Sequence, residues 1–143
     1  MTNRFYDVLI FHPTGGWGGA ERTTLNIATA LSRASINVVV LTNEVAFEKA
    51  ISDRLPVIVN PFISWFGNWG EILRDLFRFC FYIRRIKPRI VLAMMPYAAF
   101  IASVTRKLMP GSFIHVASPR GSCLNYLKHF APPSHRGLYK IFF

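Results

Sequence analysis

The sequence holds few acidic residues and few cysteines. Only 7 of its 143 residues are Asp or Glu, against 17 Lys and Arg, so the formal net charge is +10. Two cysteines, Cys80 and Cys123, are too few for the disulfide framework of a small secreted protein. The N-terminus also lacks the apolar run of a secretory signal peptide. We therefore expect an intracellular protein.

Long apolar runs are missing as well. The longest nearly apolar stretch, residues 90–104, has 15 residues and contains Pro96, whereas a membrane-spanning helix needs about 20. We expect no transmembrane segment. The apolar content is nevertheless 52%, which excludes a disordered chain and suffices for one folded domain or for half of a larger enzyme.

The acidic residues are confined to the first half of the chain. Residues 1–75 contain all seven acids and six basic residues, a net charge of −1, whereas residues 76–143 contain eleven basic residues and no acid. This asymmetry favours a polyanionic partner such as phospholipid headgroups or a lipid diphosphate. A solubilising surface, or one that matches a partner domain, would explain it too. No nucleic-acid-binding signature is present, so we expect no nucleic acid as partner.

Short apolar runs rich in β-branched residues alternate with amphipathic segments. We predict strands over residues 6–11, 37–42, 56–60, 90–95 and 112–117, and helices over 20–33, 45–53, 71–86, 97–109, 124–130 and 137–143. This order predicts an α/β fold: a Rossmann-like parallel sheet with helices on both faces. The last residues are apolar and carry no stop signal, so we expect residues 1–143 to be a fragment.

A glycine-rich loop follows the first predicted strand and opens the first helix. Gly15, Gly16, Gly18 and Gly19 lie in it, followed by Ala-Glu-Arg. Glycines let a backbone approach an anion, and a helix N-terminus presents free N–H groups to it. The loop matches neither the P-loop nor the dinucleotide-binding fingerprint. It is either a phosphate site of another kind or a tight turn without a ligand.

The residues around this loop resemble the start of family 4 glycosyltransferases of the GT-B fold. The likeness rests on the first strand, Gly-Gly-Ala-Glu-Arg at residues 18–22, Leu-Asn-Ile-Ala at 25–28, and the second strand. Residues 83–91 are similar to the family's entry into a central strand, with Arg89 where an Asp is common. Two departures are Ser35-Ile36, where the family usually has Gly-His, and Ser118-Pro119-Arg120, where a histidine often follows the strand.

The resemblance implies the N-terminal, acceptor-side part of a retaining glycosyltransferase that builds a cell-surface polysaccharide or glycolipid. The donor would be a nucleotide-sugar, the acceptor a glycan or a lipid-linked molecule, and no metal or other cofactor would be needed. The C-terminal domain that binds most of the donor would lie beyond Phe143, so residues 1–143 alone should be inactive. The loop near the donor diphosphate would comprise Gly15, Gly16, Gly18, Gly19, Glu21 and Arg22. Glu21 and Arg22 would contact the donor or only brace this loop.

Candidate acceptor-side residues are His12, Tyr97, Ser118 and Arg120. His12 ends the first strand beside the glycine loop, and Ser118 and Arg120 follow the last strand at the presumed active edge of the sheet. Arg120 would pair with an acceptor phosphate or be a solvated turn residue. We interpret His115 as a packed, hydrogen-bonded residue. The histidines have no metal-ligand spacing and no hydrolase motif is present, so the catalytic residues stay unassigned.

An aromatic and basic block spans residues 62–86. Trp65 and Trp69 precede the predicted helix, whose apolar face comprises Ile72, Leu73, Leu76, Phe79, Cys80, Ile83 and Ile86, with Phe81 on the other side. A basic helix flanked by tryptophans is typical of a membrane interface. We predict a membrane surface formed by Trp65, Trp69, Arg74, Arg78 and Arg85, or else a sheet-covering helix with a solvated arginine face. The expected location is the cytoplasm, with or without peripheral binding to the inner face of the cytoplasmic membrane.

Two alternatives to a glycosyltransferase stay open. One is a basic module that binds a membrane surface or another polyanion without catalysis. The other is a different Rossmann-like nucleotide-binding protein. The glycine loop followed by Ala-Glu-Arg favours the glycosyltransferase, whereas the acid-free second half alone would favour the binding module.

Overall fold

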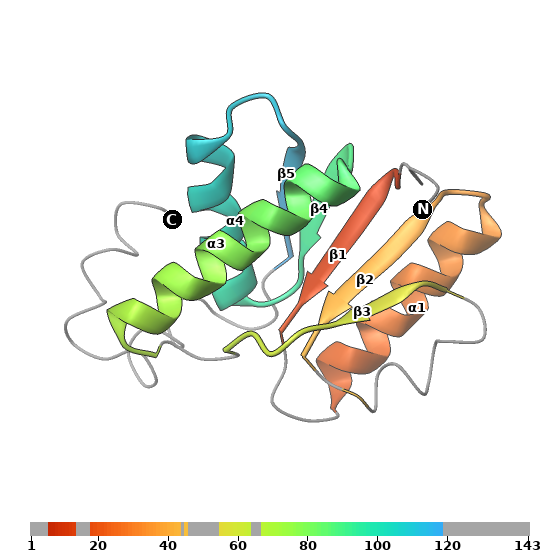
Figure 1. Ribbon diagram of the computed structural model, residues 1–143. Helices are drawn as coiled ribbons and strands as arrows, with labels where there is room; N and C mark the ends of the chain where they lie inside the picture. The colour runs from red at the N-terminus through yellow and green to blue at the C-terminus, as the bar shows by residue number, and fades with distance from the viewer. Residues whose placement is uncertain (1–5, 14–17, 44, 46–54, 64–66, 119–143) are drawn as a thin grey trace.

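One parallel sheet organises the chain, in a computed structural model that describes residues 6–13, 18–43, 45, 55–63 and 67–118. The elements are β1 (Val8–His12), α1 (Gly19–Arg33), β2 (Val38–Thr42), β3 (Val57–Val59), α3 (Trp69–Ile86), β4 (Ile90–Ala93), α4 (Pro96–Leu108) and β5 (Ile114–Ala117). All neighbouring strands are parallel, and their order is β3-β2-β1-β4-β5 (Figure 1). The predicted Rossmann-like α/β fold is confirmed.

The predicted elements agree with these to within one or two residues at each end. The helices predicted over 45–53, 124–130 and 137–143 lie outside the described residues, apart from Val45. One boundary shift has a clear cause. The Asn68 side chain accepts the N–H of Glu71 (3.0 Å), and the Glu71 carboxylate accepts the N–H of Asn68 (3.2 Å). This capping box starts α3 at Trp69, so the prediction that Trp69 precedes the helix was wrong.

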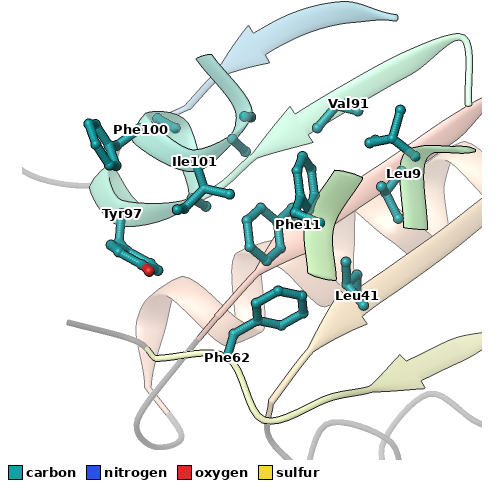
Figure 2. Packing of buried hydrophobic residues seen from close by; sticks show 14 of the residues in the cluster. Leu9, Phe11, Leu41, Phe62, Val91, Tyr97, Phe100 and Ile101 are labelled. Atoms are coloured by element: carbon teal, nitrogen blue, oxygen red, sulfur yellow. The ribbon is translucent and has the colours of Figure 1, made fainter. Parts of the chain in front are cut away.

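Helices cover both faces of the sheet. Because side chains alternate along a strand, Leu9 and Phe11 of β1 point to one face and Val8 and Ile10 to the other. The first face packs against α3 and α4, and the second against α1. On the α3 side, the ring of Phe11 stacks on Phe79, with centroids 4.5 Å apart. Figure 2 shows Phe11 in this cluster of buried hydrophobic residues, near Phe62 and Leu41. The sheet is thus the middle of three layers.

The direction of winding reverses at β1. The chain passes from β1 through α1 to β2 on one side of β1, and later returns through α3 to β4 on the other side. The carboxyl ends of β1 and β4 therefore flank a topological switch point. In open α/β sheets, ligands bind at this place. The glycine loop, which connects β1 to α1, starts there.

Candidate functional site

The site begins where α1 begins. The N-cap of α1 is Gly18, which has no side chain to cap the helix, and the first helical hydrogen bond runs from the N–H of Arg22 to the carbonyl oxygen of Gly18 (3.2 Å). Gly15 and Gly16 lie outside the described residues. The first turn of α1 thus presents its N–H groups at the carboxyl edge of the sheet, where an anion would be favoured.

The described residues do not crowd Gly19. A Cβ atom built on Gly19 would meet none of the described atoms within 4 Å, whereas one on Gly18 would lie 3.2 Å from Oε2 of Glu21. The backbone of Gly18 is extended, at φ −156°, a conformation open to any residue. Packing within the described part of the chain therefore does not explain the glycine at position 19, which leaves room for a ligand close to the backbone.

A buried polar network joins this helix start to β1. His12 is 0% exposed and faces α1, on the same side of β1 as Val8 and Ile10. Its Nε2 lies 3.2 Å from Oε1 of Glu21, and its Nδ1 lies 2.7 Å from the hydroxyl oxygen of Thr24. Glu21 is buried as well. The network fixes the first two turns of α1 against the end of β1, on either side of the glycine loop.

The protonation of His12 follows from its surroundings. Burial lowers the pKa of His12, although the hydrogen bond and the charge of Glu21 act in the opposite direction. In a neutral imidazole one nitrogen donates and the other accepts. The arrangement that satisfies both partners has Nε2–H donating to Glu21 and Nδ1 accepting from the Thr24 hydroxyl. In this geometry His12 holds the start of α1 against β1. Binding of the acceptor by His12 stays a prediction.

Tyr97 lies on the opposite face of the sheet from His12. Its side chain is buried in the α3–α4 cluster, and its hydroxyl donates to Oδ2 of Asp75 (3.0 Å), which also accepts the N–H of Ile63 (2.8 Å). The structure therefore does not bring these two candidate acceptor residues together. Sequence reasoning missed Asp75, although its position between Ile72 and Phe79 follows the spacing of the buried side of α3.

The other candidate site residues are dispersed. Arg22 is exposed on α1. Ser118 directly follows β5, and its N–H donates to the carbonyl oxygen of Ala93 (2.8 Å), while Arg120 lies outside the described residues. His115 is half-buried with Nδ1 3.3 Å from the hydroxyl oxygen of Ser103, so its packed, hydrogen-bonded interpretation is confirmed. The described ranges contain no group of three side chains that could hold a metal ion.

The candidate membrane residues also differ in their surroundings. Trp69, Arg74 and Arg85 are exposed on α3. Nε of Arg74 nevertheless donates to Oδ1 of the buried Asp75 (3.5 Å), and the guanidinium of Arg78 donates to the carbonyl oxygen of Pro61 (2.7 Å). Trp65 lies outside the described residues. None of the helices in the described part is long and apolar enough to cross a membrane.

The apolar face of α3 differs from the predicted one at Leu73. This residue was expected to face the core, but 52% of it is exposed. The sheet and α4 bury only part of a broad apolar arc around the helix, and Leu73 lies outside that part. The prediction was wrong there, and it was right that Phe81 lies away from the core.

Comparison with solved structures places the fold among glycosyltransferases. A glycosyltransferase from Rickettsia africae matches with a TM-score of 0.69 and 18% identity over 94% of this chain and 33% of its own. MurG from Acinetobacter baumannii matches with a TM-score of 0.57 and 17% identity over 78% and 35% of the two chains. Anabaena HepE, solved in complex with UDP and glucose, matches with a TM-score of 0.54 and 18% identity over 72% and 27%.

This chain spans about a third of the length of these structures. No curated protein matches it significantly. The family model of Glycosyltransferase Family 4 matches residues 17–142, from the glycine loop almost to the last residue. The chain therefore belongs to glycosyltransferase family 4.

Proposed function

We propose that this chain is the acceptor-side part of a retaining glycosyltransferase that moves a sugar from a nucleotide-sugar to a glycan or lipid-linked acceptor. The product would be a cell-surface polysaccharide or a glycolipid, made at the cytoplasmic side of the membrane. The observation that carries the proposal is the start of α1: two glycines open this helix at the topological switch point, and no described atom lies within 4 Å of the place where a Cβ of residue 19 would be.

The chemistry assigned to this place is the binding of the donor diphosphate. Negative charge grows on the leaving diphosphate during sugar transfer, and N–H groups fixed in advance stabilise it without reorganising. The His12–Glu21–Thr24 network would hold those groups in place, because it joins the first two turns of α1 to β1. In the proposed reaction these backbone N–H groups stabilise the diphosphate, so no metal ion or other cofactor is needed. Chelation should then leave transfer unchanged.

The other half of the donor site belongs to a C-terminal domain. The matches cover only 27–35% of the solved structures similar to this chain. We expect residues 1–143 to show no transfer alone and to regain it with that domain. Gly15, Gly16, Ser118 and Arg120 remain candidate contacts at the same edge of the sheet.

The decisive variant is Gly19→Ala in the complete enzyme. Its Cβ meets none of the described atoms within 4 Å, so folding should be unchanged, whereas a diphosphate close to the backbone would be displaced. Gly70→Ala is the matched control, since Gly70 is also in the first turn of a helix and, among the described atoms, its Cβ would contact Asn68 alone, at 3.3 Å. Binding of UDP, then of the other nucleoside diphosphates, would be measured by calorimetry alongside turnover.

We expect Gly19→Ala to lose nucleotide binding and turnover while Gly70→Ala keeps both. Equal binding and turnover in the two variants would contradict the assignment of this loop. A complete protein that binds none of the nucleoside diphosphates would instead favour the non-catalytic binding module, for which the exposed apolar residues of α3 are the supporting observation.

A further inference from the structure

A buried carboxylate lies at the end of α1 that is proposed to receive the donor diphosphate. Glu21 is in the first turn of this helix and is 5% exposed. Its Oε2 lies 3.2 Å from the place where a Cβ of Gly18, the N-cap residue, would be. A carboxylate suits the positive end of a helix that holds no ligand. It repels a diphosphate at the same end, because both are negative and Glu21 is shielded from water.

His12 is the side chain that can compensate this charge. It is 0% exposed, and its Nε2 lies 3.2 Å from Oε1 of Glu21. A neutral imidazole leaves the negative charge of the carboxylate in place, whereas an imidazolium balances it. The protonation of one ring therefore decides how much net charge the start of α1 presents to an incoming anion.

The charged groups around His12 are few in the described part of the chain. The elements beside it contribute uncharged side chains, namely Thr24 from α1, Thr42 in register on β2 and Met94 after β4. Arg22, next to Glu21, is exposed and stays cationic at all pH values near neutrality. Glu44 follows β2 and lies outside the described residues. The structure thus pairs the ring of His12 with the charge of Glu21.

We propose, in an inference that rests on the proposed function, that binding of the donor diphosphate is coupled to the uptake of one proton from solvent by His12. In the neutral ring Nε2 donates to Glu21, so the incoming proton goes to Nδ1. The Thr24 hydroxyl, 2.7 Å away, can accept as well as donate. It turns to accept from Nδ1, and the backbone of β1 and α1 stays in place.

Nucleotide binding and protonation then strengthen each other by the same factor. With one proton taken up, the affinity for nucleotide rises by up to about tenfold for each unit by which the pH falls. This rise spans the interval between the pKa of His12 in the free protein, which burial holds below 6.5, and its higher value in the complex. His12 is thus a positioning residue that acts through Glu21, a role different from the acceptor contact expected from the sequence.

The test is a calorimetric titration of the complete enzyme with UDP, and then with the other nucleoside diphosphates. Titrations at about pH 7, where a histidine is poised to change its charge, are repeated in buffers that differ in ionisation enthalpy. The difference in heat gives the number of protons taken up per nucleotide bound. The terminal phosphate of UDP, with a pKa of about 6, exchanges a proton of its own. Variants are therefore compared with the wild type under identical conditions, in which that contribution cancels.

His12→Gln removes the titrating ring and keeps a side chain that can hydrogen-bond to Glu21 and Thr24. It should bind UDP with the uptake of fewer protons than the wild type, by about half a proton or more. His115→Gln is the matched control. His115 is also a histidine whose pKa burial lowers, and it contacts Ser103 on the other face of the sheet. Its replacement should leave the proton uptake at the wild-type value.

Glu21→Gln keeps an oxygen that can accept from His12 and removes the charge. At about pH 8 it should bind UDP more tightly than the wild type, by about fivefold or more. This advantage should shrink towards about pH 6, where the wild type gains its proton. A residue that only braced the helix would give the opposite result, a loss of affinity. Because this comparison does not need the His12 variant, it decides the proposal even if His12→Gln does not fold, which circular dichroism would show.

Equal proton uptake by the wild type and a folded His12→Gln would overturn the coupling while leaving the nucleotide site in place. So would an affinity of Glu21→Gln at about pH 8 that is no higher than that of the wild type. A complete enzyme that binds none of the nucleoside diphosphates would overturn the proposed function together with the coupling. Failure of the proposed function and failure of the coupling alone are thus told apart by one set of titrations.

Discussion

Helices α1 and α3 pack on opposite faces of one sheet (Figure 1). They differ in how their first turns are capped and in which residues they expose. The N-cap of α1 is a glycine without a side chain, and its exposed positions are polar or small. In α3, Asn68 and Glu71 cap the first turn, and the exposed side carries four large apolar residues, Trp69, Leu73, Phe77 and Phe81. The start of α1 thus has no side chain of its own as a cap, whereas α3 is capped at its start and apolar along its side.

The difference between the helices suggests how the fold can separate two tasks. A ligand that carries diphosphate needs N–H groups at the end of a helix. An interaction surface for a larger partner needs apolar area along the side of one. Because the two helices lie on different faces of the sheet, a change in one surface need not disturb the other. Variants of both helices test the contrast between their buried and exposed groups, beginning with the largest expected effect.

The largest loss of stability is expected from truncating a side chain on the buried side of α3. Phe79→Ala removes a ring that is 0% exposed and stacked on Phe11, and should lower the free energy of unfolding by about 3–5 kcal/mol. Phe77→Ala, on the exposed side of the same helix, should change it by no more than about 0.5 kcal/mol. Urea denaturation of both variants measures the difference. Comparable losses would mean that Phe77 is covered by another part of the protein.

The sequence predicted the sheet better than it predicted this division of α3. Runs such as Val38-Val39-Val40-Leu41 are β-branched and apolar, so they indicate buried parallel strands. The apolar residues of α3, in contrast, spread over an arc wider than a sheet can cover. Helical spacing alone cannot say which edge of such an arc is left out, and so Leu73 was assigned to the core.

Only the part of the candidate site that depends on a local pattern could be predicted from the sequence. A glycine loop after a strand is a local pattern, and Gly18 and Gly19 do open α1 at the expected edge. The partners of His12 and Tyr97, in contrast, lie on other elements, 12 and 22 positions away in the sequence. The bonds of His12 to Thr24 and of Tyr97 to Asp75 depend on how α1 packs against β1 and α3 against α4, which the sequence pattern does not specify.

The next effect concerns the buried carboxylate of α3. Asp75→Ala should cost about 2 kcal/mol or more, because it leaves the N–H of Ile63 and the hydroxyl of Tyr97 without their acceptor, at about 1–3 kcal/mol each. Asp75→Asn keeps one oxygen that can accept both and should cost less. The same denaturation experiment applies. An equal loss in the two variants would show that charge, and not these hydrogen bonds, is what the core requires.

A smaller effect should appear as a dependence of stability on pH. Burial holds the pKa of His12 below its ordinary value of 6.5, and that of His115 likewise. The unfolded chain then binds more protons than the folded chain near pH 6. Stability should be full above pH 6.5 and fall as the pH drops, by at most about 1.4 kcal/mol per pH unit for each histidine.

His12→Gln should flatten this dependence, and His115→Gln should remove the remaining part. Thermal melts between about pH 7.5 and about pH 5.5 would measure both. Stability of the wild type that rises as the pH falls would contradict the expected direction. It would mean that Glu21 outweighs burial and that His12 is an imidazolium in the folded chain.

The smallest effects compare the two helix starts directly. Asn68→Ala removes the cap of α3 and should cost about 1 kcal/mol. Gly19→Ala removes no cap, meets none of the described atoms, and replaces the residue of lower helix propensity, so it should be neutral or stabilising by at most about 1 kcal/mol. Thermal denaturation of the two variants gives the signs.

Opposite signs would show that α3 depends on its own side chains for its start, whereas the start of α1 is stable without them. The glycine at position 19 would then lower stability in the isolated chain, and its presence would need a reason outside the fold. If Gly19→Ala were destabilising, the glycine would need no explanation outside the fold, because the turn itself would require it.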